Sequence, residues 1–182
     1  MNNIEIIRPR PEDVELINEF FEIVLRDTFE KNELSDMTEL LAEEIQCKKD
    51  NLKQDLESGG RDRFFLIAKE EGRIISTIEY SSPNELIMSF TNGEYRDLVE
   101  IGTVFVHPEY QNKGIGSMMM RLMFDELKRK GINEFCLDSG YKTAQRTWTK
   151  KLGAPAYIMK DYWEEGNDHM IWRVSLEDMY KE

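Results

Sequence analysis

The chain has 182 residues, of which 40% are hydrophobic and 33% are charged. This length and composition are typical of a soluble globular domain with a sizeable core, so we expect a single domain over residues 1–182. The 24 basic and 36 acidic residues give a formal net charge of −12. That charge opposes binding to a nucleic-acid backbone or an anionic membrane and suits a cationic substrate, although solubility alone also explains it.

The sequence also lacks the marks of a membrane-spanning or secreted protein. No apolar run approaches the roughly 18 to 20 residues of a membrane span, and no basic segment followed by an apolar one stands at the N-terminus. Cys47 and Cys136 are far apart and have neither metal-ligand spacing nor the pattern of a disulfide framework. We therefore expect a cytoplasmic protein with reduced cysteines and no metal.

The first predicted elements are a short strand and two helices. Residues 4–7 alternate weakly, as a strand does, and the prolines after them set up a helix start near Glu12. Apolar residues spaced by three and four positions continue this helix over residues 14–25. A second helical pattern covers residues 36–56 and ends at the glycines 59–60.

An antiparallel region follows the helices. Residues 64–68 and 74–80 have strand patterns around a short turn, which predicts a hairpin, and Leu86 to Phe90 is a third candidate strand. A further strand at residues 101–106 precedes a glycine loop and a helix over residues 114–130.

The C-terminal part begins with a strand at residues 133–138. A helix with Trp148 and Leu152 comes next and ends at Gly153, and a terminal hairpin is predicted from the apolar runs 157–159 and 169–174. The strand-helix-strand order from Glu100 onward favours two parallel neighbouring strands.

The glycine loop is the strongest functional signal. The strand ends at His107 and Pro108, and the loop reads Gln111-Asn112-Lys113-Gly114-Ile115-Gly116-Ser117. Its glycines let a ligand approach the backbone, and the first amides of the next helix favour an anionic phosphate. A P-loop is excluded because Lys113 precedes Gly114 instead of following the second glycine, and a dinucleotide fingerprint fails because Met119 replaces its third glycine.

The remaining pattern, Gln111, Gly114 and Gly116 between a strand and a helix, resembles the GNAT superfamily of acyl-CoA-dependent N-acetyltransferases. The order of the predicted elements agrees over nearly the whole chain. The resemblance implies an α/β fold of the α+β type, with a mixed, mostly antiparallel central sheet, one parallel strand pair and about four flanking helices. It also implies acetyl-CoA as cosubstrate and no metal. The alternative is that the glycines only shape a tight strand-to-helix turn.

If the resemblance holds, the loop binds the pyrophosphate of coenzyme A through backbone amides. These are the amides of Gln111, Asn112, Lys113, Gly114, Ile115 and Gly116, with Ser117 adding its amide or hydroxyl. The family pairs the strand before the loop with the pantetheine arm, which here implies Val104 and Val106. Ser139 is expected to contact the same arm or only to cap the next helix.

Acetylation of an amine requires a base, because amines are mostly protonated at neutral pH. Glu100 stands where some members of the superfamily carry a glutamate base, and a solvated strand-end glutamate is the alternative. Glu79 is the second choice, as base or as ligand of the substrate's cation, although plain surface exposure is the simpler expectation. We assign neither His107 nor His169 to catalysis, since neither has a nearby serine, cysteine or acid in a recognisable nucleophile arrangement.

The general acid is less clearly defined than the base. Many members of the superfamily use a tyrosine a few residues before a Leu-Gly pair, but Thr149 stands there in this chain. Tyr141 and Tyr157 are substitutes by position only, and solvent is another proton source. The backbone amide of Val104 or Phe105 is expected to stabilise the tetrahedral oxyanion.

Two functions from different classes remain open. The first is transfer of an acetyl group from acetyl-CoA to a primary amine of a small molecule or protein, by direct attack in a ternary complex. The second is a non-catalytic acyl-CoA-binding regulatory module, which the missing tyrosine favours. Residues 28–61 and 154–174 are expected to build the acceptor pocket, and the terminal hairpin offers an edge through which a homodimer can form.

Overall fold

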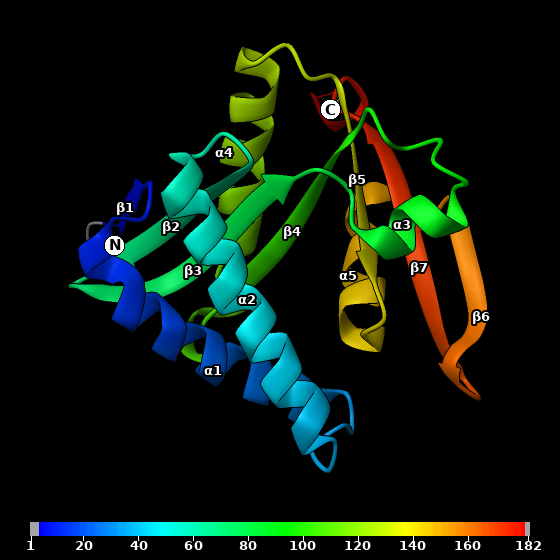
Figure 1. The fold of residues 1–182 in the computed structure, drawn as a ribbon, viewed down its shortest axis with the longest axis horizontal. Coiled ribbons are helices and arrows are strands. Elements are labelled where there is room, and N and C mark those ends of the chain that lie inside the picture. The colour runs from blue at the N-terminus through cyan, green and yellow to red at the C-terminus, as the bar shows by residue number, and fades with distance from the viewer. Residues whose placement is uncertain (1–3, 181–182) are drawn as a thin grey trace. The chain divides into compact units, whose positions relative to one another are not determined.

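The structure is a computed structural model that describes residues 4–180. Its strands have the hydrogen-bonded order β1-β2-β3-β4-β5-β7-β6 (Figure 1). They are β1 Ile4–Ile7, β2 Arg63–Glu70, β3 Arg73–Ser81, β4 Val99–Val106, β5 Glu134–Ser139, β6 Tyr157–Glu164 and β7 Asn167–Ser175. β4 and β5 are parallel, whereas β1–β2, β5–β7 and β6–β7 are antiparallel. The predicted mixed sheet with one parallel pair is therefore confirmed.

Within residues 4–180, the four predicted helices are found at the expected positions, and one further helix, α3, is present. They are α1 Val14–Lys31, α2 Thr38–Ser58, α3 Glu85–Phe90, α4 Ile115–Arg129 and α5 Lys142–Leu152. Short 3-10 helices cover Pro11–Asp13, Pro108–Tyr110 and Asp178–Tyr180.

The chain divides into two compact units. Unit 1 contains the chain up to Tyr80 together with Thr103–Asp125, and unit 2 contains Ser81–Gly102 together with the chain from Glu126 onward. The strand β4 contributes residues to both units. The single domain expected over residues 1–182 stays a prediction, and residues 1–3, on which the expectation of no leader partly rests, lie outside the described residues.

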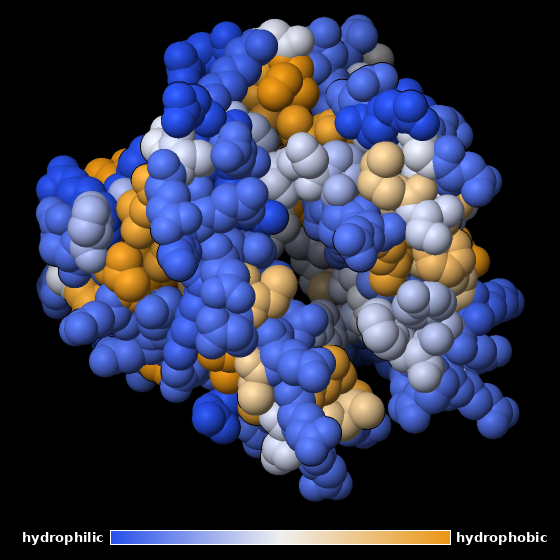
Figure 2. Space-filling model, in the orientation of Figure 1, coloured by the Kyte–Doolittle hydropathy of each residue, from blue (hydrophilic) through white to orange (hydrophobic). Residues whose placement is uncertain are grey.

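The core of unit 1 lies between its first two helices and its strands. The apolar stripe of α1 packs against α2, β2 and β3 through Ile17, Phe20, Phe21, Val24, Leu52, Phe65, Ile67 and Ile74. Figure 1 shows α1 and α2 lying across β2 and β3, and Figure 2 shows a hydrophilic outer surface over α2. Each large side chain buried in this way stabilises the fold by about 1.5–3 kcal/mol, so the amphipathic pattern of α1 determines which face it presents to the sheet.

The core of unit 2 lies around its buried strands β5 and β7. β5 pairs with β7 along its whole length, from Glu134 opposite Ser175 to Ser139 opposite Met170. Side chains of α3, the following loop and both strands pack together, namely Ile87, Tyr95, Cys136 and Ile171, with Tyr157 of β6 against them. This packing fixes the ends of β5 and β7, where several polar side chains lie.

One predicted element is wrong, since Leu86 to Phe90 belongs to a helix rather than a strand. The Asn84 side chain caps α3 by accepting a hydrogen bond from the Ile87 amide at 2.9 Å. Of the residues in this run, only Ile87 is fully buried. A short apolar run carries too little periodicity to separate the two structures, and the capping asparagine decides between them.

Candidate active site

The loop before α4 has the backbone geometry of an anion cradle. It follows β4 and a 3-10 turn in which the His107 side chain accepts a hydrogen bond from the Glu109 amide at 3.3 Å. Asn112 has a φ of 59° and Gly114 a φ of 84°, while Lys113 between them does not lie in the left-handed region. Such alternation turns successive N–H groups toward one concave face, which suits an anion.

The start of α4 adds further amides to this loop. The Gly114 carbonyl accepts a hydrogen bond from the Met118 amide at 3.0 Å, so the helix starts at Ile115. Amides in the first turn have no acceptor within their own helix. A Cβ on Gly114 would meet no atom within 4 Å, whereas one on Gly116 would lie 3.4 Å from a Val106 methyl group. The loop is thus open at Gly114 and closely packed at Gly116.

The side chain of Gln111 holds the loop in place. Its Nε2 donates to the Val106 carbonyl at 3.1 Å and to the Asp27 carboxylate at 3.2 Å, and its Oε1 accepts from Lys31 at 2.7 Å. These contacts tie the loop to β4 and α1. The backbone amide of Gln111 donates to the Pro108 carbonyl at 3.3 Å, so both the side chain and the amide of this residue serve to hold the loop itself.

The other loop residues differ in exposure. Asn112, Lys113 and Ser117 are exposed, and Ile115 is buried. The Lys113 ammonium lies 5.2 Å from the centre of the Tyr110 ring, which is a cation–π distance. Lys113 therefore remains close to the loop, where its charge can act on an anion.

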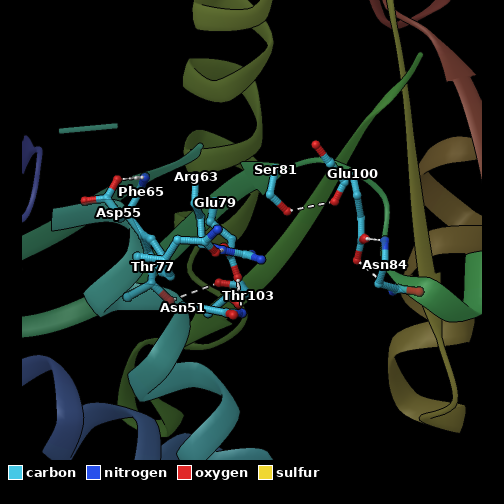
Figure 3. Close-up of polar contacts among 12 residues, drawn as sticks. Asn51, Asp55, Arg63, Phe65, Thr77, Glu79, Ser81, Asn84, Glu100 and Thr103 are labelled. Atoms are coloured by element: carbon cyan, nitrogen blue, oxygen red, sulfur yellow. Dashed lines mark hydrogen bonds and ion pairs between the residues drawn. The ribbon is translucent and has the colours of Figure 1, made fainter. Parts of the chain in front are cut away.

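Glu79 is buried, so the expectation of plain surface exposure is wrong. The residue is 2% exposed, and both of its carboxylate oxygens have partners in unit 1. Oε2 pairs with Arg63, and Oε1 accepts from the Thr103 hydroxyl and, at 3.2 Å, from Asn51 (Figure 3). The carboxylate ties α2, β2, β3 and β4 together, and a role as base would require it to give up these contacts.

Thr103 adopts an unusual backbone conformation at the point where β4 passes from one unit to the other. Its φ is 48°, in the left-handed region that β-branched residues rarely enter. Besides its hydroxyl bond to Glu79, its carbonyl accepts from the Thr77 hydroxyl at 2.9 Å. These contacts hold the strand in this conformation just before Val104 and Val106, which are both half-buried.

Glu100 is half-buried in unit 2 and is held by a residue that the sequence analysis did not single out. Its Oε2 accepts from the Asn84 backbone amide at 2.6 Å, and its Oε1 accepts from the Asn84 side-chain amide at 3.1 Å (Figure 3). The same side-chain amide lies 3.0 Å from a carboxylate oxygen of Asp138. The available signal was Pro83-Asn84 before an apolar run, which is a helix-start pattern.

The end of β5 brings Asp138 into this group. β4 pairs with β5 only at Val99 with Phe135 and at Glu100 with Cys136, so Asp138 lies beyond the last paired position. Burial raises the pKa of the Cys136 thiol, and the carboxylates of Glu100 and Asp138 act in the same direction. The thiol is therefore a poor nucleophile at neutral pH.

His169 has an acidic neighbour, contrary to the expectation from the sequence. Its Nε2 lies 3.0 Å from Asp138 Oδ2, and its Nδ1 accepts a hydrogen bond from the Trp163 indole at 3.2 Å. The imidazole is buried, whereas Trp163 is 55% exposed. His107, in unit 1, lies with its Nδ1 3.9 Å from the Glu109 carboxylate, and its ring contacts Phe20 in a tilted geometry and Tyr110 edge-to-face.

The remaining predicted residues have ordinary structural contacts. Ser139 is buried, and its hydroxyl accepts from the Tyr141 amide at 3.1 Å, as expected for a turn that starts α5. Tyr157 packs edge-to-face on Tyr95 with ring centres 5.9 Å apart. Thr149 is exposed in the last turns of α5. None of these contacts by itself identifies a general acid.

Metal and membrane features can be assessed for residues 4–180. In that range, no group of three or more His, Cys, Asp and Glu side chains is arranged to hold a metal ion. No helix in this part of the chain combines the length and apolar character that crossing a membrane requires.

Comparison with protein-family models gives one match. The model described as the acetyltransferase (GNAT) family matches residues 17–154. That range contains most of α1 and all of β4, the glycine loop, α4 and β5, and therefore the greater part of the candidate site. A search of curated proteins gives no match.

Solved structures provide an independent comparison of the fold. A GNAT-family protein from Desulfovibrio desulfuricans has a TM-score of 0.71 and 14% sequence identity, covering 96% of this chain and 99% of its own. PaiA N-acetyltransferase from Thermoplasma acidophilum, in complex with coenzyme A, has a TM-score of 0.67 and 19% sequence identity, and the match covers 95% of this chain and 99% of PaiA. YncA from Salmonella typhimurium, with its cofactor acetyl-CoA, has a TM-score of 0.67 and 17% sequence identity, and the match covers 96% of this chain and 95% of YncA. These similarities show a shared fold.

Proposed function

Because the chain belongs to the acetyltransferase (GNAT) family, we propose that it transfers the acetyl group of acetyl-CoA to the primary amine of a cationic acceptor. The observation that carries this proposal is the loop with left-handed Asn112 and Gly114 that runs from β4 into α4. Support also comes from PaiA and YncA, which share the fold and were solved with coenzyme A or acetyl-CoA. The net charge of −12 favours a cationic acceptor.

The donor is proposed to bind along β4 and the loop. The pyrophosphate would accept hydrogen bonds from the amides of residues 112–116, with Ser117 at the rim, because the Gln111 amide already donates to the Pro108 carbonyl. The pantetheine arm would pair with the backbone of Val104 and Val106 and contact Ser139. Backbone amides suit this task because they are fixed donors that need no side-chain ordering.

Glu100 is proposed as the base, because hydrogen bonds from Asn84 hold both of its oxygens in place and a carboxylate oxygen can take up a proton. One proton passes from the ammonium group to Glu100, and the neutral nitrogen attacks the thioester carbon. The new C–N bond gives a tetrahedral intermediate, and its collapse breaks the C–S bond. The second nitrogen proton passes to solvent, and the thiolate of coenzyme A gains a proton from solvent or from Tyr141, which solvent then reprotonates. The amide of Val104 or Phe105 would stabilise the oxyanion.

The test is release of coenzyme A thiol from acetyl-CoA with a panel of primary amines, including diamines, aminoglycosides, amino acids and protein amines. We expect turnover with at least one cationic amine, and mass spectrometry should show an acetylated product. Tight acetyl-CoA binding without turnover of any amine would contradict the proposal and favour the acyl-CoA-binding module.

Glu100→Gln tests the assigned base. The glutamine amide keeps one oxygen that can accept from the Asn84 backbone amide, loses the other of the two hydrogen bonds to Asn84, and cannot accept a proton. We expect kcat to fall by about 10²–10⁴-fold, with the acidic limb of the pH profile removed and acetyl-CoA affinity unchanged. A wild-type pH profile in this variant would exclude Glu100 as the base.

A further inference from the structure

The Asp138–His169–Trp163 cluster in unit 2 has no role in the function proposed above. His169 is buried, and the Asp138 side chain is 15% exposed. The indole nitrogen can only donate a hydrogen bond, so Nδ1 of His169 must accept it and the imidazole proton lies on Nε2. Nε2 then donates to Asp138, which fixes this tautomer.

The donor that occupies Nδ1 belongs to an exposed side chain. Trp163 is 55% exposed, and it lies on β6, the last strand in the sheet order. Its ring contacts Tyr162 edge-to-face at 4.8 Å, and its one polar atom bonds His169. A single hydrogen bond of this kind contributes about 0.5–1.5 kcal/mol, so a ligand can displace it.

Gly140 lies beside the hydrogen bond between Trp163 and His169, and its lack of a side chain makes room for both nitrogen atoms. A Cβ on Gly140 would lie 2.5 Å from the indole nitrogen and 3.2 Å from His169 Nδ1. Gly140 is not in the left-handed region, so its backbone does not require glycine. Glycine is needed at this position because the indole nitrogen and Nδ1 of His169 occupy the space that a side chain would fill.

The surroundings suit a cation that carries N–H donors. Tyr162 lies 5.8 Å from the imidazole and 5.3 Å from Phe90, which gives aromatic rings beside Nδ1. Figure 2 shows pale and orange surface over α3 and β6, where these rings lie. The carboxylate of Asp138 is directly behind the imidazole, and Asn84 joins it to Glu100 by bonds of 3.0 and 3.1 Å.

We propose that Nδ1 of His169 binds the amino group of a primary alkylammonium acceptor, which displaces the Trp163 indole from this nitrogen. An ammonium N–H takes the place of the indole N–H beside the aromatic rings, and Asp138 acts on its charge from the far side of the imidazole. This site specifies where the acceptor of the proposed acetyl transfer binds. Its assignment as the acceptor site rests on that proposed function. It places the amine in the same hydrogen-bonded group as Glu100.

The first test observes the imidazole directly. The chain has only two histidines, so a long-range ¹H–¹⁵N spectrum contains two imidazoles, and His107→Asn assigns them. On addition of n-butylammonium chloride we expect the Nδ1 signal of His169 to move and saturate while that of His107 stays. Tetramethylammonium, a cation without N–H, should not reproduce the shift. No shift with n-butylammonium, or an equal shift with both cations, overturns the proposal.

The second test uses two variants that both break the bond between Trp163 and His169. Trp163→Phe removes the N–H and keeps an aromatic ring, so n-butylammonium should bind about fivefold more tightly. Gly140→Ala puts a methyl group beside Nδ1, so the same ligand should bind at least about tenfold more weakly. Trp148→Phe, which changes another tryptophan of unit 2, should leave the affinity unchanged. Shifts of the same sign in the first two variants contradict the proposal.

Calorimetry with acetyl-CoA separates the two proposals. All three variants should bind acetyl-CoA within about twofold of wild type, because the changed residues belong to unit 2 and the loop before α4 belongs to unit 1. If wild type shows the His169 shift but neither binds nor turns over acetyl-CoA, the proposed function fails and the amine site stands. If turnover is normal and His169 does not respond, only the amine site fails.

Discussion

Asn84 fixes the position of Glu100 through two hydrogen bonds, and it also caps α3. Asn84→Ala should therefore lower kcat and reduce the free energy of unfolding by about 1 kcal/mol. Asn84→Ser separates the two effects, because serine caps a helix but lacks the side-chain amide that bonds Glu100. We expect near wild-type stability and a kcat several-fold below wild type in steady-state assays of Asn84→Ser. A wild-type kcat in this variant would show that the side-chain amide does not position Glu100.

His107 gives a prediction about pH. Burial lowers the pKa of its imidazole, and the charge of Arg73 adds to this, so the folded protein binds fewer protons here than the unfolded chain. The resulting stability is present above the unfolded pKa of about 6.5 and is lost as the pH falls through and below it. His107→Asn keeps an oxygen that can cap the Pro108 turn but does not titrate.

Urea unfolding of both proteins between about pH 7 and pH 5 measures the difference. Wild type should lose stability on acidification more steeply than His107→Asn. Parallel loss of stability in the two proteins would mean that His107 does not contribute to the pH dependence.

The residues of the candidate site differ in how far the sequence alone predicts them. The loop residues are neighbours in the chain, so their proximity follows from the sequence, and Gly114 permits the left-handed backbone found there. The burial of Glu79 depends on Arg63, Asn51 and Thr103, which come from other elements and leave no local pattern. The pairing of His169 with Asp138 depends in the same way on the register of β5 with β7.

At the scale of elements, the succession of β4, the loop and α4 can be predicted from the sequence of this segment. Strand residues, two left-handed positions and an apolar stripe succeed one another without competing signals. Gly114 has a φ of 84° and room for a Cβ, and Gly131, just after α4, has a φ of 75° and equal room. Alanine at either position should cost about 1 kcal/mol through backbone strain alone.

Thermal unfolding of Gly114→Ala and Gly131→Ala tests this expectation. The two variants should lose similar stability, since neither glycine faces an atom that a methyl group would contact. A much larger loss of stability in Gly114→Ala than in Gly131→Ala would show that packing of the loop, and not backbone strain alone, depends on Gly114.

The misassigned element, α3, shows where prediction by pattern fails. The run of residues 86–90 is short and apolar, which suits a strand and a helix equally. Its conformation is decided by Asn84, whose side chain bonds the Ile87 amide, and by the contacts of Ile87 with Tyr95 and Ile171 in the core of unit 2.

At the scale of the whole molecule, the periodic signals of amphipathic helices and alternating strands predicted the order of the elements except α3. The mixed sheet was implied by the resemblance to the GNAT superfamily. The division into two units was not predicted, since β4 shows no break in its sequence where Thr103 turns left-handed. The net charge acts at this same scale and influences which acceptors approach the protein.

The net charge of −12 predicts a salt effect. Raising NaCl from about 20 to about 200 mM should increase the KM of a cationic amine several-fold, because the longer-range attraction is screened. kcat should change little, since contacts within the site are screened less. A KM that does not depend on salt would show that the overall field does not assist binding of the acceptor.

The most direct test of the account is a calorimetric titration of acetyl-CoA into wild type, Gly114→Ala and Gly131→Ala. The loop is proposed to hold the donor's pyrophosphate, and a methyl group at Gly114 would project into the open side of that loop. We expect one acetyl-CoA per chain for wild type, equal affinity for Gly131→Ala, and affinity at least about tenfold lower for Gly114→Ala. Absence of binding in wild type, or equal affinity in all three proteins, would contradict the account.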